Sequence, residues 1–260
     1  MNMDKIFSDQ VDGEIIKQKN DEDLKRKSMD WFLASCRHNY SYHFEWMGRP
    51  IIQYPQDIVA LQEIIWRTRP DLIVECGVAR GGSLVFNASM LALIDYCDMM
   101  SGGKGGTVES YPSKVIGIDI DIRSHNRAAL DAHPLQHKID LVEGSSIDGE
   151  VVAEVRSLAK AYSNIMVILD SNHTHDHVLE ELRQYAGLVG NGNYCVVLDT
   201  VIEHMPKEMH ENRSWGPGNS PKSAVDTFLE ENNCFEVDEK IDDKLLISVG
   251  RGGYLKRVKS

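Results

Sequence analysis

Basic residues are few in this sequence of 260 residues. The 28 lysines and arginines are outnumbered by 40 aspartates and glutamates, which gives a formal net charge of −12 at pH 7. Proteins that track a nucleic-acid backbone neutralise its phosphates with clustered Lys and Arg, and the chain has no dense basic stripe. The composition therefore argues against a nucleic-acid partner and favours a small-molecule substrate.

The sequence also lacks long apolar runs and paired cysteines. No run approaches the ~18 residues of a membrane span, and the N-terminus has no uninterrupted apolar core of a secretory signal. The five cysteines show no CxxC spacing, and Cys76 and Cys195 stand in apolar runs, where a thiol behaves as a small hydrophobe. These absences predict a cytoplasmic protein with reduced thiols and no membrane partner.

Composition divides the chain into three predicted segments. Residues 1–28 are polar with charges of both signs, which predicts a mobile arm or a solvated helix. Residues 29–54 are rich in aromatic side chains and form either a cap over a pocket or a satellite hydrophobic cluster. Residues 55–260 are the predicted main domain, in which a Gly- and Ser-rich stretch at 101–113 indicates a flexible surface insertion.

The main domain alternates short apolar runs with amphipathic stretches. The runs at 71–78, 115–120, 139–144, 165–170 and 194–200 predict strands, and the stretches at 55–69, 82–97, 125–132, 148–162, 175–189 and 223–232 predict helices. This order is typical of a Rossmann-like α/β fold with a mostly parallel seven-stranded sheet and helices on both faces. Two closing runs, 234–239 and 244–250, have no predicted helix between them and indicate a C-terminal antiparallel hairpin.

A glycine-rich turn follows the first of these strands. It reads Glu75-x-Gly77-x-x-x-Gly81-Gly82-Ser83, and glycine permits both a sharp turn and close approach to a ligand. NAD-binding folds favour G-x-G-x-x-G. A carboxylate at Glu75 would repel a pyrophosphate but can organise the amino-acid end of a cationic sulfonium ligand. The turn therefore favours S-adenosylmethionine, and a turn that only joins strand and helix is the alternative.

Polar residues after the next two strands extend this predicted site. Asp119 ends one strand, where a carboxylate can accept hydrogen bonds from both ribose hydroxyls. Ser145 and Ser146 follow another and would line the adenine side, although a helix N-cap at Ser or Asp148 is the simpler interpretation of this turn. The predicted cofactor residues are Glu75, Gly77, Ala79, Gly81, Ser83, Asp119, Ser145, Ser146 and Asp170.

Two later predicted strands end in aspartate, at Asp170 and Asp199. If these strands are neighbours, the two carboxylates converge at the carboxyl edge of the sheet and suit Mg²⁺. Methyl transfer to an alcohol needs a deprotonating hydroxyl, whose pKa a metal lowers and whose proton a histidine accepts. We therefore expect Asp170 and Asp199 as metal ligands, and His173 as the catalytic base beside Asp170. A helix N-cap for either aspartate and a surface position for the histidine are the alternatives.

The run HTHDH favours a competing hypothesis. His173, His175 and His177 resemble the H-x-H-x-D-H zinc signature of metallo-β-lactamase-fold hydrolases, but the spacing is one residue short. That fold also begins with a different arrangement of layers. A zinc-dependent hydrolase is kept as the alternative function.

These residues and several longer segments resemble the cephalosporin hydroxylase family. The similarity spans about residues 38–256 and is carried by SYHFEWMGRPIIQYPQDIVALQEIIWRTRPDLIVECGVARGGSL, VIGIDIDIRSHNRAAL, VILDSNHTHDHVLEEL, VVLDTVIE and RSWGPGNSPKSAV. The resemblance implies a class I S-adenosylmethionine-dependent O-methyltransferase with Mg²⁺ near the tips of strands four and five. It further implies a hydroxyl substrate on an antibiotic-like or sugar-containing small molecule, and a homo-oligomer.

The resemblance leaves the metal site one ligand short. Related macrolide-sugar methyltransferases place a histidine three positions after the first metal-binding Asp, as His173 follows Asp170, but they pair two acidic residues at the fifth strand's tip. Here Leu198 precedes Asp199. Glu203, His204 or water is left as the third ligand, or the metal binds weakly. A non-catalytic S-adenosylmethionine-binding protein is a further alternative.

The long loop at 204–223 is rich in Gly and Pro. Its length predicts either a lid over the substrate or a rigid connector. Arg213 and Trp215 in this loop are the predicted substrate contacts.

Overall fold

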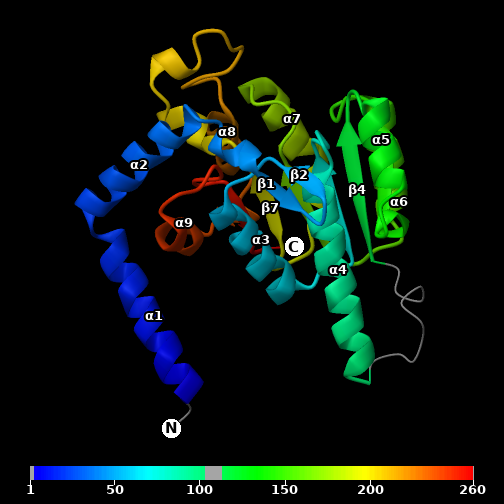
Figure 1. The fold of residues 1–260 in the computed structure, drawn as a ribbon, viewed down its shortest axis with the longest axis horizontal. Coiled ribbons are helices and arrows are strands. Elements are labelled where there is room, and N and C mark those ends of the chain that lie inside the picture. Colours follow the sequence, from blue (N-terminus) through cyan, green and yellow to red (C-terminus); the bar gives the residue numbers. More distant parts are fainter. Residues whose placement is uncertain (1–2, 103–112, 260) are drawn as a thin grey trace.

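A central sheet of seven strands organises the chain, and a computed structural model describes its residues 3–102 and 113–259 (Figure 1). The strands lie in the order β5-β4-β3-β6-β7-β9-β8. Their bounds are β3 Leu72–Cys76, β4 Lys114–Asp119, β5 Ile139–Glu143, β6 Ile165–Leu169, β7 Tyr194–Val197, β8 Phe235–Val237 and β9 Tyr254–Arg257. The predicted insertion at 101–113 falls almost wholly outside the described residues, so its structure stays a prediction.

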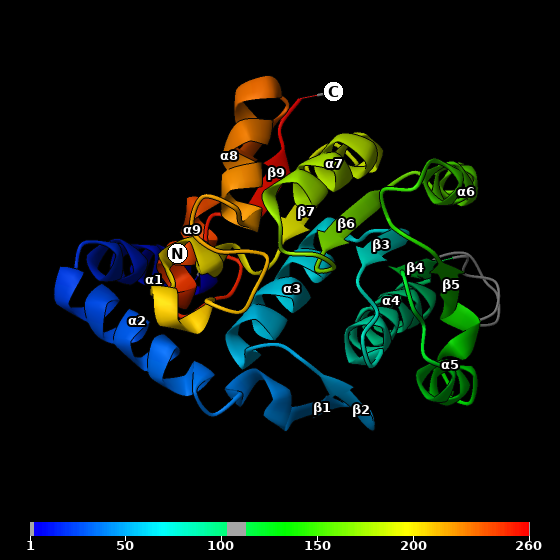
Figure 2. The same cartoon turned by 90° about the horizontal axis from the view of Figure 1, so that it is seen from above.

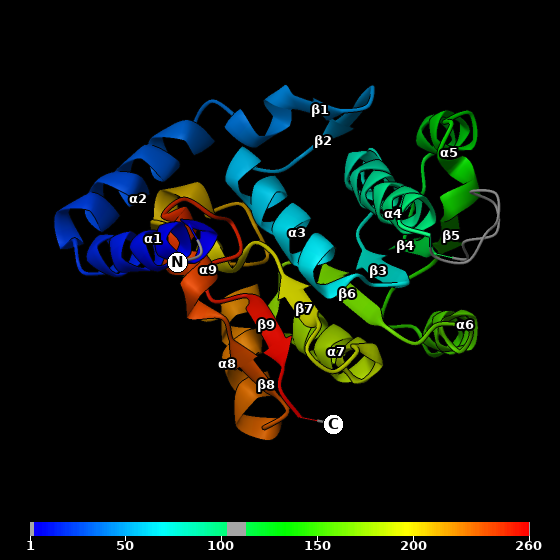
Figure 3. The same ribbon diagram turned by 90° about the horizontal axis from the view of Figure 1, so that it is seen from below.

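Helices cover both faces of this sheet (Figures 2 and 3), with α3, α4 and α5 on one face and α6, α7 and α8 on the other. Their bounds are α3 Pro55–Thr68, α4 Gly82–Met100, α5 Ser124–Asp131, α6 Gly149–Ala159, α7 His175–Tyr185 and α8 Pro221–Glu231. Because both faces are covered, every residue of β3, β6 and β7 is buried. The first five strands of the sheet pair in parallel, which confirms the predicted Rossmann-like fold with a mostly parallel sheet.

Alternation along each strand distributes its side chains between two cores. In β3, Leu72 and Val74 pack with α6, α7 and α8, whereas Ile73 packs with α3 and α4. Successive strand residues point to opposite faces, so Glu75 points with Ile73 toward α4. The register also aligns the strand ends, because Leu169 of β6 lies opposite Val197 of β7. Residues that follow these two strands are therefore brought to the same edge of the sheet.

The C-terminal strands pair antiparallel as expected, but the second of them is not where the apolar run at 244–250 predicts it. The short helix α9, Glu239–Leu245, occupies the start of that run, and β9 begins at Tyr254 and lies between β7 and β8. The rest of the run is a loop whose Ser248 hydroxyl and Val249 N–H donate to the buried Asp57 carboxylate. Apolar content alone does not distinguish a strand from a loop that packs into the core.

The N-terminal residues form two helices, α1 Met3–Lys19 and α2 Glu22–Cys36. In Figure 1, α1 extends away from the sheet, and its last turn contacts α9 through the Gln18 amide and an ion pair of Lys19 with Glu239. The predicted boundary after residue 28 lies inside α2, so the division into arm, cap and main domain stays a prediction. No helix of residues 3–102 or 113–259 is long and apolar enough to cross a membrane.

The aromatic segment forms a cluster and also reaches the glycine turn. The ring of Tyr54 lies 5.5 Å from that of Tyr40 and 6.3 Å from that of Trp31, measured between centroids. The segment continues as a two-stranded ribbon, β1 Phe44–Trp46 and β2 Arg49–Ile51. The backbone of β2 packs so tightly on α4 that a Cβ at Gly82 would lie 2.2 Å from the Pro50 carbonyl oxygen.

Candidate active site

Two adjoining hollows open at the carboxyl ends of β3, β4, β5 and β6, the position where open α/β sheets bind ligands. They share Gly77, Ala79 and Asp170. Further predicted cofactor residues line each hollow. We call the one that Asp119, Ser145 and Ser146 line the first hollow, and the one that Ser83 lines the second hollow. The fold therefore brings residues from four separate turns to one cleft.

The glycine turn has a backbone that only small residues fit. Gly77 has a φ of +103°, and a Cβ there would lie 2.0 Å from the Asp170 carbonyl oxygen. Gly81 has a φ of +80° and is the N-cap of α4, where a Cβ would lie 2.7 Å from the Leu130 side chain. Both glycines are thus required by packing and by conformation. The close approach at Gly77 ties the turn after β3 to the turn after β6.

Glu75 lies beneath this turn and does not line the cleft. Its side chain is 1% exposed and accepts hydrogen bonds from the Ser83 hydroxyl and from the Asn87 amide, the latter at 2.7 Å. Burial raises the pKa of Glu75 to about 7, although the hydrogen bonds from these two donors stabilise the carboxylate and lower the pKa. Glu75 therefore reaches the cleft through Ser83, which does line it.

Asp119 holds the glycine turn from the neighbouring strand. One carboxylate oxygen accepts the backbone N–H groups of Val78 at 2.9 Å and Ala79 at 3.1 Å. The other accepts the N–H of Asp121 at 3.2 Å. The exposed Ile120 side chain lines the same hollow, so a carboxylate and an apolar surface lie side by side there.

A buried polar group behind the cleft wall was not predicted from the sequence. Glu181 on α7 is fully buried and accepts hydrogen bonds from the hydroxyls of Ser146 and Ser171. His177, one helical turn before it, lies 3.0 Å from the Ser146 oxygen. The spacing of His177 and Glu181 places them on one face of α7, but a sequence does not show that this face is buried. In the same region Asp148 caps α6, as the simpler interpretation of that turn predicts.

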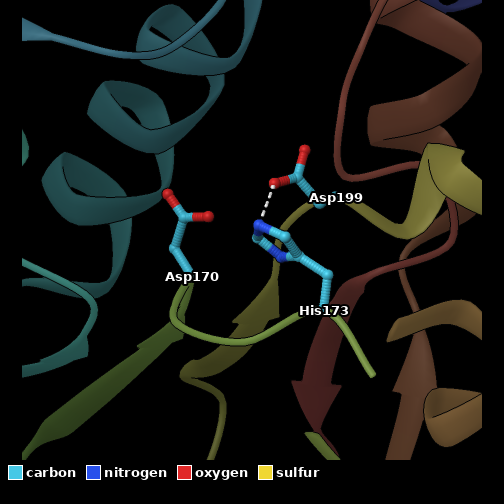
Figure 4. A group of neighbouring side chains, drawn as sticks. All are labelled: Asp170, His173 and Asp199. Carbon is cyan, nitrogen blue, oxygen red and sulfur yellow. Dashed lines mark ion pairs between the residues drawn. The ribbon is translucent and has the colours of Figure 1, made fainter. Parts of the chain in front are cut away.

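Asp170, His173 and Asp199 point toward one another at the tips of β6 and β7 (Figure 4). Each offers one ligand atom, and these atoms all lie within 4.8 Å of one another. Nε2 of His173 is 3.3 Å from a carboxylate oxygen of Asp199. Burial and the negative charge of Asp199 raise the pKa of Asp170 well above its ordinary range. The converging carboxylate oxygens of Asp170 and Asp199 form a donor set that fits a hard divalent ion.

The two side chains predicted as possible third ligands lie outside this group. Glu203 accepts hydrogen bonds from the Gly218 N–H at 3.0 Å and from the Ser220 hydroxyl, so it anchors the following loop. Within the described residues, one group of three acidic, histidine or cysteine side chains lies close enough to share an ion. It consists of Asp170, His173 and Asp199. Leu198 is 1% exposed and packs in the core with α3 and α4, so position 198 does not face the site.

The histidines of the HTHDH run diverge instead of converging on one ion. His175 lies 2.9 Å from the Ser223 hydroxyl on α8, and His177 contacts Ser146 and Glu181. Only His173 faces the two aspartates among the described residues. Tetrahedral zinc sites need their ligands within about 2 Å of one ion, so this arrangement argues against the zinc-dependent hydrolase.

The loop at 204–223 brings Trp215 beside His173, and Arg213 beside Trp215. The ring of Trp215 meets that of His173 edge to face, with centroids 5.9 Å apart. The guanidinium carbon of Arg213 lies 5.5 Å from the centroid of the Trp215 ring. An aromatic side chain therefore borders His173.

Comparison with known proteins identifies the family. The model of the Rhamnosyl O-methyltransferase/CmcI family matches residues 38–258. A rhamnosyl O-methyltransferase of Mycobacterium leprae is 32% identical over 214 residues, 82% of this chain and 82% of that protein. One of Mycobacterium tuberculosis is 29% identical over 215 residues, 82% of this chain and 77% of that protein.

Solved structures share the fold at lower identity. A structure of CmcI with Mg and SAM is 18% identical and covers 84% of this chain and 77% of its own, with a TM-score of 0.55. An O-methyltransferase from Bacillus cereus in complex with SAH is 12% identical and covers 92% of this chain and 91% of its own, with a TM-score of 0.51. The sequence matches confirm the predicted resemblance to the cephalosporin hydroxylase family. The chain belongs to the rhamnosyl O-methyltransferase/CmcI family and is an S-adenosylmethionine-dependent O-methyltransferase.

Proposed function

We propose that this enzyme methylates a hydroxyl of a sugar or a sugar-containing small molecule, with Mg²⁺ held by Asp170 and Asp199. The observation that carries the proposal is the convergence of Asp170, His173 and Asp199 beside the cleft. The curated relatives are named for a rhamnosyl acceptor, and the CmcI structure contains Mg and SAM. An acidic protein whose cleft opens beside these residues suits such a small acceptor.

Both hollows of the cleft carry groups that suit the methyl donor. Asp119 has a carboxylate at the edge of the first hollow for the ribose, with Ile120 next to it for the base. In the second hollow, the buried side-chain oxygen of Gln53 has no hydrogen-bond partner within the described residues. An acceptor left unpaired in this position suits the ammonium group of the methionine end. Ser83, whose hydroxyl donates to Glu75, lines the same hollow.

In this proposal His173 accepts the proton of the substrate hydroxyl. When bound, the metal would lower the pKa of that hydroxyl. Nε2 of His173 faces both carboxylates, and Asp199 at 3.3 Å stabilises the imidazolium that forms when Nε2 takes the proton. We assign His173 as the base rather than as a third ligand because Mg²⁺ prefers oxygen donors and keeps several waters. Trp215 borders His173 and would pack on the apolar face of a sugar ring, with Arg213 behind it.

Calorimetry of ligand binding tests the cofactor and metal assignments. We expect heat of binding for S-adenosylmethionine, tighter binding with Mg²⁺ present, and loss of affinity in Asp119→Ala. Asp170→Asn and His173→Ala should each lower turnover of a rhamnoside acceptor by about 10²-fold or more, whereas Asp176→Asn, an exposed neighbour on α7, should not. No heat with the parent protein would refute the cofactor site. Unchanged turnover in His173→Ala would refute the base. A homo-oligomer in the cytoplasm stays a prediction.

A further inference from the structure

Glu181 controls the direction of two hydroxyl groups in the wall of the cofactor cleft. It lies on α7, is 0% exposed and does not itself line the cleft. One of its oxygens accepts hydrogen bonds from Ser146 at 2.5 Å and from Ser171 at 2.6 Å. These serines follow β5 and β6, and both line the first hollow. A single buried carboxylate thus joins two turns of the site from behind.

The chemistry of the hydroxyl group decides what these serines offer to a ligand. A hydroxyl has one hydrogen to donate and two lone pairs. Ser146 and Ser171 both direct their hydrogen inward to Glu181, so only acceptor lone pairs are left for the cleft. The ring of His177 lies 3.0 Å from the Ser146 oxygen. Because the hydrogen of Ser146 is already engaged, the tautomer of His177 that fits donates its Nε2–H to this oxygen and leaves one Ser146 lone pair for the cleft. The cleft therefore has two hydroxyl oxygens that act as acceptors and not as donors.

The burial of Glu181 makes this arrangement hard to reverse. Its second carboxylate oxygen has no hydrogen-bond partner among the residues that the structure describes. A buried carboxylate depends on the donors it has, because it would otherwise lose the hydrogen bonds that water supplies. Turning either hydroxyl toward the cleft would remove one of these donors. The two serines are consequently held as acceptors even when the cleft is filled.

The same hollow contains the features expected around a nucleoside. Asp119 is a carboxylate at its edge, and Ile120 and Ala79 provide apolar surface for a flat ring. Two hydroxyl acceptors on the wall match the two N–H donors of an exocyclic amino group, which adenine carries. Hypoxanthine carries a carbonyl oxygen at that position and would place an acceptor against acceptors. We infer that Glu181 is a positioning residue that fixes Ser146 and Ser171 as acceptors for the adenine amino group and so makes the site select adenosine over inosine.

This inference rests on the proposed cofactor site, and binding ratios test it. We would measure the dissociation constants of S-adenosylhomocysteine and of S-inosylhomocysteine, its deaminated form, by calorimetry on the full chain. The parent protein should bind the adenosine form about thirtyfold more tightly, as expected for two lost hydrogen bonds at about 1 kcal/mol each. In Glu181→Ala the hydroxyls are free to turn and donate to the carbonyl, so the ratio should fall to about threefold or less. Glu180→Ala, on the neighbouring position of α7, should keep the parent ratio.

A second pair of variants decides the question if Glu181→Ala does not fold. Ser171→Ala removes one acceptor and should lower the ratio by about threefold or more, and Ser171→Thr, which retains the hydroxyl, should restore it. A merely structural role of Glu181 would weaken both ligands equally, and an unchanged ratio in Glu181→Ala and Ser171→Ala would overturn the inference. Equal affinity of the parent for the two ligands would also overturn it while leaving the proposed function intact. Binding of neither ligand would instead refute the proposed cofactor site.

Discussion

Replacing Glu75 by glutamine tests how the buried carboxyl group beneath the glycine turn affects stability. Glu75 is 1% exposed, and burial is the main cause that raises its pKa from 4.5 to about 7. The folded protein therefore holds this proton more tightly than the unfolded chain does. The resulting contribution to stability is fully present below about pH 4.5 and is lost as the pH rises through about 7.

The magnitude follows from the difference between the two pKa values. About 2.5 pH units correspond to about 3 kcal/mol of unfolding free energy. Glutamine carries no charge at any pH, and its amide oxygen can still accept from Asn87, while the Ser83 hydroxyl can turn to accept from the new amide N–H. Between pH 4.5 and 8.5, we therefore expect the difference in unfolding free energy to move by about 3 kcal/mol in favour of Glu75→Gln.

Urea unfolding followed by circular dichroism, at a series of pH values without ligand, measures this difference. Glu236→Gln, an exposed position on β8, serves as the control and should differ from the parent by a nearly constant amount across the series. If the free-energy difference between parent and Glu75→Gln does not change with pH, the buried carboxyl group does not titrate as we describe, and the reasoning is wrong.

Three further substitutions test the site. Gly77→Ala places a Cβ 2.0 Å from the Asp170 carbonyl oxygen at a φ of +103°. The unfolding free energy, measured by urea unfolding, should therefore fall by about 3 kcal/mol or more, and Mg²⁺ binding should weaken. An unfolding free energy within about 1 kcal/mol of the parent value would contradict the packing. Leu198→Glu restores an acidic residue but points it into the core, so it should destabilise the protein by several kcal/mol and not improve Mg²⁺ affinity by calorimetry. Trp215→Ala should raise the KM for a sugar acceptor about threefold or more while leaving the affinity for S-adenosylhomocysteine unchanged; equal loss of both would place Trp215 in the fold rather than at the acceptor.

Most of the architecture was readable from the sequence because its signals are local. Each parallel strand is a short apolar run, and the helices between them have amphipathic spacing. The C-terminus was the exception. The run at 244–250 is apolar enough for a strand, but Asp57 on α3 accepts hydrogen bonds from Ser248 and Val249 and holds the segment as a loop. Such a partner lies almost two hundred residues away, and no local pattern reveals it.

The sequence by itself determined the glycine turn, the aspartates at the strand ends and the nearby His173, because these depend on residue type and on position relative to a strand. Only the tertiary structure decided which of them meet. The pairing of β6 with β7 brings Asp170 to Asp199, and the pleat turns Leu198 into the core and away from the site. It likewise buries Glu181 behind the cleft, where its effect on two serines depends on contacts between turns. Contacts between distant segments are set by how the sheet and helices pack, which a single sequence does not spell out.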